Sequence, residues 1–266
     1  MSTNENKGKK AEVTALQAIS AGDRKDWISL AFVQAGICVC VPAFLLGALL
    51  AEAMPIWPAI ISGSLGYLIV VVGMVATGMI GCDLGLASCT CCQAGFGKSG
   101  ARFIVSTIFA VNMIGWFGIQ NGVCGEAFSN AMLAMTGWDI PVVVSNTIWG
   151  IIMLLTAVYG VHALEKLDKI SIPLLMIIMC YGIFLAFKVY GTGNLNDEGT
   201  VQSMSFMSGV ALSFNFTAVG TITGPDYTRF QKSRKDTVKS VFYGVFPMGV
   251  ITLIMGIVLT KLSGQY

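Results

Sequence analysis

Charge is scarce in this chain of 266 residues. Asp, Glu, Lys and Arg make up 11% of the sequence, whereas soluble domains carry about 25%, so the chain cannot cover a water-facing surface of its size. It has a single histidine, His162, and no nucleophile–base pair, metal motif or phosphate-binding loop. Catalysis is therefore not indicated, and no cofactor is expected. The net charge of +2 comes without a nucleic-acid-binding or cysteine-rich signature, so no nucleic-acid partner is expected either.

Apolar sequence is abundant instead. Hydrophobic residues make up 55% of the chain, and the mean hydropathy is +0.75. Seven stretches approach the ~20 residues that a bilayer requires, at 27–50, 57–80, 103–133, 142–161, 170–190, 204–222 and 238–262. The sequence thus predicts an all-α, polytopic membrane protein. Residues 1–26 are polar, without the apolar core of a signal peptide, and predict a solvated tail before a transmembrane domain at 27–266.

The basic residues are distributed very unevenly between the predicted loops. Fourteen of the sixteen lie on one side, and Lys188 and Lys261 lie on the other. The positive-inside rule then places the N-terminus in the cytoplasm, with a multi-pass chain in the plasma membrane. Seven-helix receptors and rhodopsins, the alternative class, have the N-terminus outside. A retinal protein also needs a lysine in the middle of its last span, whereas Lys239 and Lys261 lie near the two ends.

One motif points to a ligand inside the membrane. Residues 115–121 read GWFGIQN within the third apolar stretch. Burying Gln120 and Asn121 at membrane depth is costly unless they face a partner, a cavity or a ligand. The glycines leave room beside Trp116, and an aromatic face next to amide groups can orient a planar, polar small molecule. The motif therefore predicts a transport pathway.

Two of the predicted spans contain helix-breaking residues. Gly36 and Pro42 interrupt the first, and Asn215 and Gly220 lie in the middle of the sixth. Broken helices are tolerated in membranes where the freed backbone lines a cavity. Breaks in spans five apart are what two inverted five-helix repeats would produce. The alternative is that membrane helices simply contain more Gly and Pro than soluble ones.

Four stretches, in the same order and spacing, resemble the nucleobase–cation symporters, within them the cytosine permease and hydantoin transporter branch. They are residues 32–36 (FVQAG), 115–118 (GWFG), 159–164 (YGVHAL) followed by Leu167, Ile170 and Pro173, and 220–230 (GTITGPDYTRF). The resemblance implies twelve spans, ten of them in a LeuT-type inverted repeat. This chain would hold the first repeat and two helices of the second, without the eighth helix. Whether it is a fragment or a truncated gene stays open.

The resemblance also implies a substrate site. Trp116 matches the aromatic residue on which the family stacks its heterocycle, and Gln120 matches an amide of the hydantoin branch. Phe216 matches an aromatic residue of the cytosine branch, and Asn215 lies where that branch has a small polar residue. Met113 replaces a substrate-binding glutamine of the cytosine branch, which puts cytosine in doubt. The alternative is that Trp116 and Phe216 only pack helices.

For the coupling ion, the resemblance implies backbone carbonyls at the first-helix break, at Gly36 and near Cys40. These ligands suit Na⁺, but H⁺ coupling is left open. Glu126 is the one plausible titrating side chain inside the predicted spans; about 15 Å along the helix from Trp116, it is expected at the membrane interface rather than in a proton relay.

The expected function is secondary active import of a nucleobase or related planar heterocycle, such as cytosine, another purine or pyrimidine, hydantoin or allantoin, coupled to Na⁺ or H⁺. The expected partners are that small molecule and membrane lipid. The alternative is a non-transporting seven-helix membrane protein, receptor-like or a degenerate remnant. The identity of the base, the ion and the oligomeric state are left open.

Overall fold

The computed structural model describes residues 16–158, 161–192, 195 and 204–264. Within these residues the chain is helical, apart from an isolated β-bridge between Lys25 and Gln231, so the predicted all-α class is confirmed. The helices are η1 (Ala21–Asp23), α1 (Trp27–Cys38), α2 (Val41–Ala53), α3 (Ile56–Leu84), α4 (Ser88–Cys91), α5 (Gln93–Gly100), the π-helix η2 (Ala101–Val105), α6 (Ser106–Thr136), α7 (Val142–Val158), α8 (Val161–Tyr190), α9 (Phe206–Thr217), α10 (Val219–Thr228) and α11 (Arg234–Ser263).

Within the described residues, each of the seven predicted spans lies mainly on helix. Five stretches are long and apolar enough to cross a membrane, and α1 with α2 makes a sixth that is bent by 52°. The seventh, α7, is a shorter apolar helix of 17 residues. The fifth span was expected to begin at residue 170, but α8 begins at Val161, because the charged residues before Ile170 continue the helix instead of forming a loop.

The two predicted helix breaks differ in strength. Between α1 and α2, Val39 (φ −88°, ψ 75°) and Cys40 (φ −144°, ψ 158°) leave the helical conformation. Pro42 then lies in the first turn of α2, where its missing N–H breaks no intrahelical bond. In the sixth span, Ala218 separates α9 from α10 but keeps helical angles, so α9 and α10 together form one continuous stretch. The first break is confirmed; the second is much weaker than expected.

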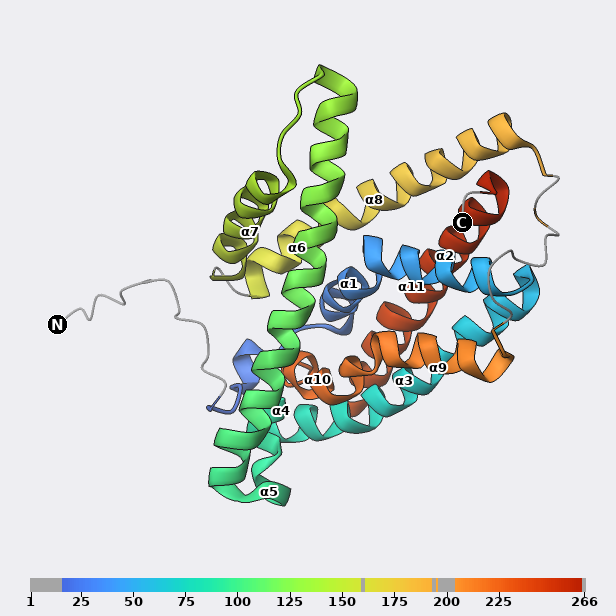
Figure 1. The fold of residues 1–266 in the computed structure, drawn as a ribbon. Helices are drawn as coiled ribbons and strands as arrows, with labels where there is room; N and C mark the ends of the chain where they lie inside the picture. The colour runs from blue at the N-terminus through green and yellow to red at the C-terminus, as the bar shows by residue number, and fades with distance from the viewer. Residues whose placement is uncertain (1–15, 159–160, 193–194, 196–203, 265–266) are drawn as a thin grey trace.

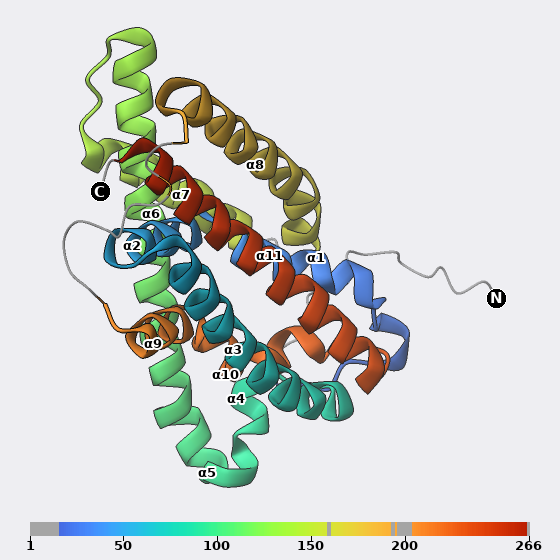
Figure 2. The same ribbon diagram turned by 90° about the vertical axis from the view of Figure 1, so that its right-hand side faces the viewer.

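Six helices form a closely packed bundle: α1, α2, α3, α9, α10 and α11. Within it, α11 lies along α1, α2 and α3 (Figure 2). The contact between α2 and α11 depends on two glycines: a Cβ at Gly47 would overlap the carbonyl oxygen of Leu253, and one at Gly256 would overlap that of Phe44. Small residues of this kind let membrane helices approach closely. Hydroxyl groups join α3 to α9 and α10 by donating to backbone carbonyls: Ser213 to Gly63 at 2.7 Å, Thr77 to Thr221 at 2.6 Å and Thr228 to Gly78 at 2.7 Å.

A hairpin of α6 and α7 lies outside this bundle (Figure 1). Of the 31 residues of α6, Gly125 and Ser129 are the buried ones, and both face the α7 side of the hairpin. The Ser145 hydroxyl donates to the Gly125 carbonyl at 2.8 Å, and the rings of Phe128 and Trp149 meet edge to face. The hairpin is therefore held together mainly by its own two helices.

The segment before α1 is not a solvated tail along its whole length. Ile19 is buried in a cluster with Leu30 and Phe230. The Lys25 N–H donates to the Phe230 carbonyl at 2.7 Å, and the Arg24 guanidinium donates to the Gln231 carbonyl at 2.9 Å. The domain boundary predicted at residue 26 thus cuts through a packed segment that joins α1 to the connection between α10 and α11.

Candidate functional site

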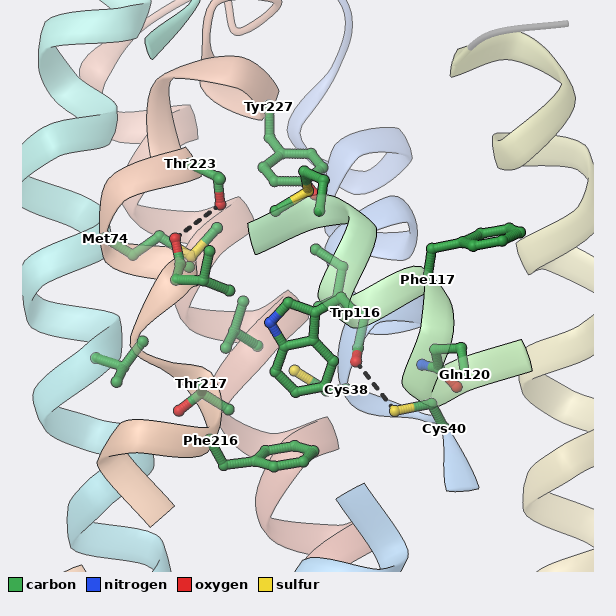
Figure 3. Close-up of a pocket in the computed structure, with 16 residues that line it drawn as sticks. Cys38, Cys40, Met74, Trp116, Phe117, Gln120, Phe216, Thr217, Thr223 and Tyr227 are labelled. Carbon is green, nitrogen blue, oxygen red and sulfur yellow. Dashed lines mark hydrogen bonds between the residues drawn. The ribbon is translucent and has the colours of Figure 1, made fainter. Parts of the chain in front are cut away.

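A cavity of about 360 Å³ opens where the hairpin meets the bundle. Its walls come from the α1–α2 break, α3, α6, α9, α10 and α11 (Figure 3). The residues that line it are Ile37, Cys38, Cys40, Val70, Met74, Met113, Trp116, Phe117, Gln120, Phe216, Thr217, Val219, Gly220, Thr223, Tyr227 and Val245. Its volume is within the range of small-molecule sites.

Trp116 and Phe216 meet in this cavity. Their ring centroids are 5.2 Å apart and their planes are at 85°, an edge-to-face contact. The two rings touch each other, so no flat molecule fits between them in this conformation. A heterocycle would instead lie on one ring, with the other ring bordering it.

Gln120 lies one helical turn after Trp116 on the same wall. Its side chain lies beside that of Cys40, whose thiol donates to the Ile37 carbonyl at 3.4 Å (Figure 3). The amide of α6 therefore faces the break between α1 and α2, and it can both donate to and accept from a ligand.

Two hydroxyls contribute acceptors to the cavity wall. The Thr217 hydroxyl donates to the Ser213 carbonyl, and that of Thr223 donates to the Val219 carbonyl, each at 3.0 Å. Because both hydroxyl protons are used within their own helices, the oxygens face the cavity as acceptors. With the Trp116 N–H and the Gln120 amide, the site can recognise a ring that carries both N–H and C=O groups.

Two predicted site residues lie off the cavity. Asn215 is exposed and is not part of the lining. Gly36 lies inside α1, two residues before its end, and faces Asp168 of α8. Trp116, Gln120, Phe216 and Cys40 do line the cavity.

Sequence reasoning missed Thr223, Tyr227 and Met74 as lining residues. Thr223 and Tyr227 are four residues apart on α10, a spacing that places them on one helical face. This spacing could have identified them from the sequence as neighbours in one site. Met74 carried no such signal, since it is one apolar residue among many in α3.

Residues 21–266 match the family described as permeases for cytosine and purines, uracil, thiamine and allantoin. The chain belongs to this family. It is 27% identical over 237 residues to the cytosine permease of Escherichia coli K12, covering 88% of this chain and 54% of the relative. It is 25% identical over 247 residues to the purine-uracil permease NCS1 of Arabidopsis thaliana, covering 83% and 41%. The chain thus spans about half the length of these curated relatives, all of them named as permeases.

Solved structures of the transporter Mhp1, of the nucleobase-cation-symport-1 family, have the same fold. The closed form with bromovinylhydantoin bound superposes with a TM-score of 0.82 at 17% identity, covering 96% of this chain and 62% of Mhp1. The inward-facing form gives 0.80 at 18% identity, covering 97% and 59%. The expected transporter fold, with the first repeat and the beginning of the second, is therefore confirmed.

Proposed function

We propose that this chain forms the substrate site of a secondary active transporter that imports a planar nitrogen heterocycle, a nucleobase or a relative such as hydantoin or allantoin, together with Na⁺ or H⁺. The observation that carries the proposal is the pairing of Trp116 and Gln120 on one wall of a membrane cavity, opposite the α1–α2 break. The indole supplies the flat surface, and the amide reads the polar edge of the ring.

Met113 argues against cytosine as the main substrate. It lines the cavity one turn before Phe117 and offers only a thioether, which is a weak acceptor and no donor. A ring with hydrogen-bond donors and acceptors on the side that faces Met113 would leave those groups without a hydrogen-bond partner. We infer a preference for rings whose edge at Met113 is apolar or substituted, as in a 5-substituted hydantoin or uracil.

The α1–α2 break supports a cation half-site at the Gly36 and Cys40 carbonyls. The last backbone hydrogen bond of α1 runs from the Val39 N–H to the Ala35 carbonyl. The carbonyls that follow Ala35, beginning with that of Gly36, therefore have no N–H donor within the helix. The Cys40 carbonyl accepts the Phe44 N–H at 3.2 Å and keeps a second lone pair. Asn215, the remaining residue proposed for the substrate site, is exposed in this structure and would reach the substrate only after a movement of α9.

The charge asymmetry of the loops supports a plasma-membrane protein with a cytoplasmic N-terminus. In a background without native cysteines, Ser233→Cys should resist an impermeant thiol reagent added outside, and Asp139→Cys should react with it. The reverse labelling pattern would refute this orientation.

The function is tested by binding and uptake in proteoliposomes, with purines, pyrimidines, hydantoins and allantoin as competitors. We expect saturable binding of one class of planar heterocycle, and uptake that depends on an imposed Na⁺ or H⁺ gradient. If no heterocycle binds to well-folded protein, the alternative of a non-transporting membrane protein is favoured.

A further inference from the structure

Gln34 is a fully buried amide close to the cavity. It belongs to α1, in the half of the bent α1–α2 span that precedes the break. Its side chain is 0% exposed, and within the described part of the chain neither Nε2 nor Oε1 has a hydrogen-bond partner. A buried amide without partners destabilises a fold, whereas an apolar residue of similar shape avoids this cost. The packing of α1 therefore does not explain why an amide occupies this position.

The spacing of residues along α1 places Gln34 between the cavity and an apolar cluster. Cys38, Gln34 and Leu30 follow one another at intervals of four residues, so they share one face of the helix. Cys38 lines the cavity, and Leu30 is buried against Phe230 and Ile19. Gln34 therefore lies one helical turn from the cavity wall and one turn from the cluster.

The end of α10 faces this part of α1. Tyr227 lines the cavity together with Cys38 (Figure 3). Phe230, three residues after Tyr227, packs on Leu30. The two segments thus meet both at the cavity and at the apolar cluster. Gln34 lies between these two meeting points, on the face of α1 that is turned toward α10.

The apolar cluster closes the inner end of this interface. Beside it, the Lys25 N–H donates to the Phe230 carbonyl at 2.7 Å, and Lys232 forms an ion pair with Asp26. In the orientation that the basic loops support, this end of the bundle faces the cytoplasm. A molecule that leaves the cavity between α1 and α10 toward the cytoplasm therefore passes Gln34.

We propose that Gln34 forms a second, transient binding position for the heterocycle between the cavity and the cytoplasm, an inference that rests on the proposed transport function. The ligand class is a planar ring with adjacent N–H and C=O groups, as in uracil and hydantoin. A carboxamide pairs with both groups at once, because it offers a donor and an acceptor side by side. Gln120 offers the same two groups in the cavity. The polar edge of the ring then passes from one amide to the other when Leu30 and Phe230 separate, and it keeps hydrogen-bond partners in an apolar layer.

The test compares Gln34→Met with Gln34→Asn in proteoliposomes made with the gene product, with labelled uracil, hydantoin and allantoin as probes. Met keeps the length of the side chain and removes the amide, whereas Asn keeps the amide and shortens the side chain. Gln34→Met should bind the ring at equilibrium within about twofold of wild type and exchange it about tenfold more slowly, as expected for the loss of two hydrogen bonds. Gln34→Asn should exchange it faster than Gln34→Met. Gln17→Met, which removes an exposed amide before α1, is the matched control and should leave binding and exchange unchanged.

A purely structural role for Gln34 predicts the opposite order of the two variants. Met is closer to Gln in size than Asn is, so packing alone would make Gln34→Met the faster of the two. Thermal unfolding gives separate evidence, since Gln34→Met loses an amide without partners and should melt at or above the wild-type temperature. A Gln34→Met protein that exchanges the ring at the wild-type rate, melts at a lower temperature or fails to fold would overturn the proposal.

Thiol labelling tests the path apart from transport. In a background without native cysteines, Gln34→Cys should react with an impermeant thiol reagent in inside-out vesicles, because position 34 becomes accessible when the apolar cluster opens. Thr237→Cys, at a buried position where α11 meets α3, is the control and should stay unreactive. If wild type binds none of the three rings, the proposed function fails, and the labelling still decides whether Gln34 lies on an inner path. An unreactive Gln34→Cys would refute that path.

Discussion

The six-helix bundle and the α6–α7 hairpin are built in contrasting ways. In the bundle, α2 and α11 meet backbone to backbone at Gly47 and Gly256, and the side chains between helices are almost fully buried. In the hairpin, α6 presents large apolar residues such as Ile114 and Val111, 70% and 66% exposed, away from the bundle. The bundle therefore behaves as one unit, and the hairpin as a second unit attached to it.

The candidate site lies on the boundary between these units. Trp116 and Gln120 come from the hairpin, whereas Phe216, Thr223 and Tyr227 come from the bundle. A movement of one unit against the other changes the distance between Trp116 and the bundle wall. A site divided in this way can be opened and closed without repacking either unit, which is the mechanical requirement of alternating access.

The largest expected effect is on stability, and it compares a glycine of the bundle with a glycine of the hairpin. Gly256→Ala should lower the free energy of unfolding by about 3 kcal/mol, because its methyl group meets a backbone carbonyl that cannot rotate away. Gly122→Ala on α6, where nothing lies within 4 Å, should change it by less than about 0.5 kcal/mol. Denaturation in mixed detergent micelles measures both. Equal effects would mean that the bundle is no more tightly packed than the hairpin.

The next effect concerns the hairpin's part of the site. Trp116→Ala should weaken binding of every accepted heterocycle at least tenfold, about 1.4 kcal/mol, since it removes the stacking surface. Trp138→Ala, which removes an indole that is 69% exposed beyond the end of α6, is the control and should bind normally. Unchanged affinities in Trp116→Ala would make Trp116 a packing residue.

A smaller effect is expected inside the hairpin. A Cβ at Gly125 would overlap the side-chain amide of Asn146 on α7. That amide can rotate, and the backbone nitrogen of Asn146, 2.9 Å from the added Cβ, needs only a small shift, whereas at Gly256 a backbone oxygen lies 2.1 Å away. Gly125→Ala should therefore destabilise the protein by about 1 kcal/mol, less than Gly256→Ala. The same unfolding measurement applies. A loss as large as that of Gly256→Ala would show that α6 and α7 are as rigidly joined as the bundle.

The smallest expected effect tests whether Gln120 recognises the polar edge of the heterocycle, as distinct from the stacking surface of Trp116. Gln120→Leu keeps the stacking ring and removes the amide, so it should change the order of preference among heterocycles by about fivefold, the size of one hydrogen bond of about 1 kcal/mol. Competition binding across the same panel measures it. A uniform loss for all heterocycles would assign Gln120 to helix packing instead.

Local patterns in the sequence were enough to find the helices and the first break. Apolar length located the spans, and Gly36 with Pro42 located the interruption to within a few residues of Val39 and Cys40. The same hydropathy signal placed the start of the fifth helix too late, because α8 begins with charged residues whose backbone is already helical. The packed segment around Ile19 was missed since its apolar partner, Phe230, is distant in the sequence.

The site was predictable where the motif itself carried the chemistry. Trp116 and Gln120 are four apart and fall on one wall, as their spacing requires. Asn215 depends on how α9 is rotated, which no local pattern determines, and it is exposed. Gly36 lies against Asp168 of α8, a contact between residues distant in the sequence that no local pattern reveals.

The bond between the Arg24 guanidinium and the Gln231 carbonyl joins residues 207 positions apart. Chains are synthesised at about 5–20 residues per second, so roughly 10–40 s pass between the emergence of the two groups. During that interval the segment before α1 lacks its partners Phe230 and Gln231, although Gly85, whose carbonyl accepts the Ile19 N–H, has already been made. The order of synthesis thus makes closure at this end of the bundle a late step of biogenesis, completed when the connection before α11 leaves the ribosome.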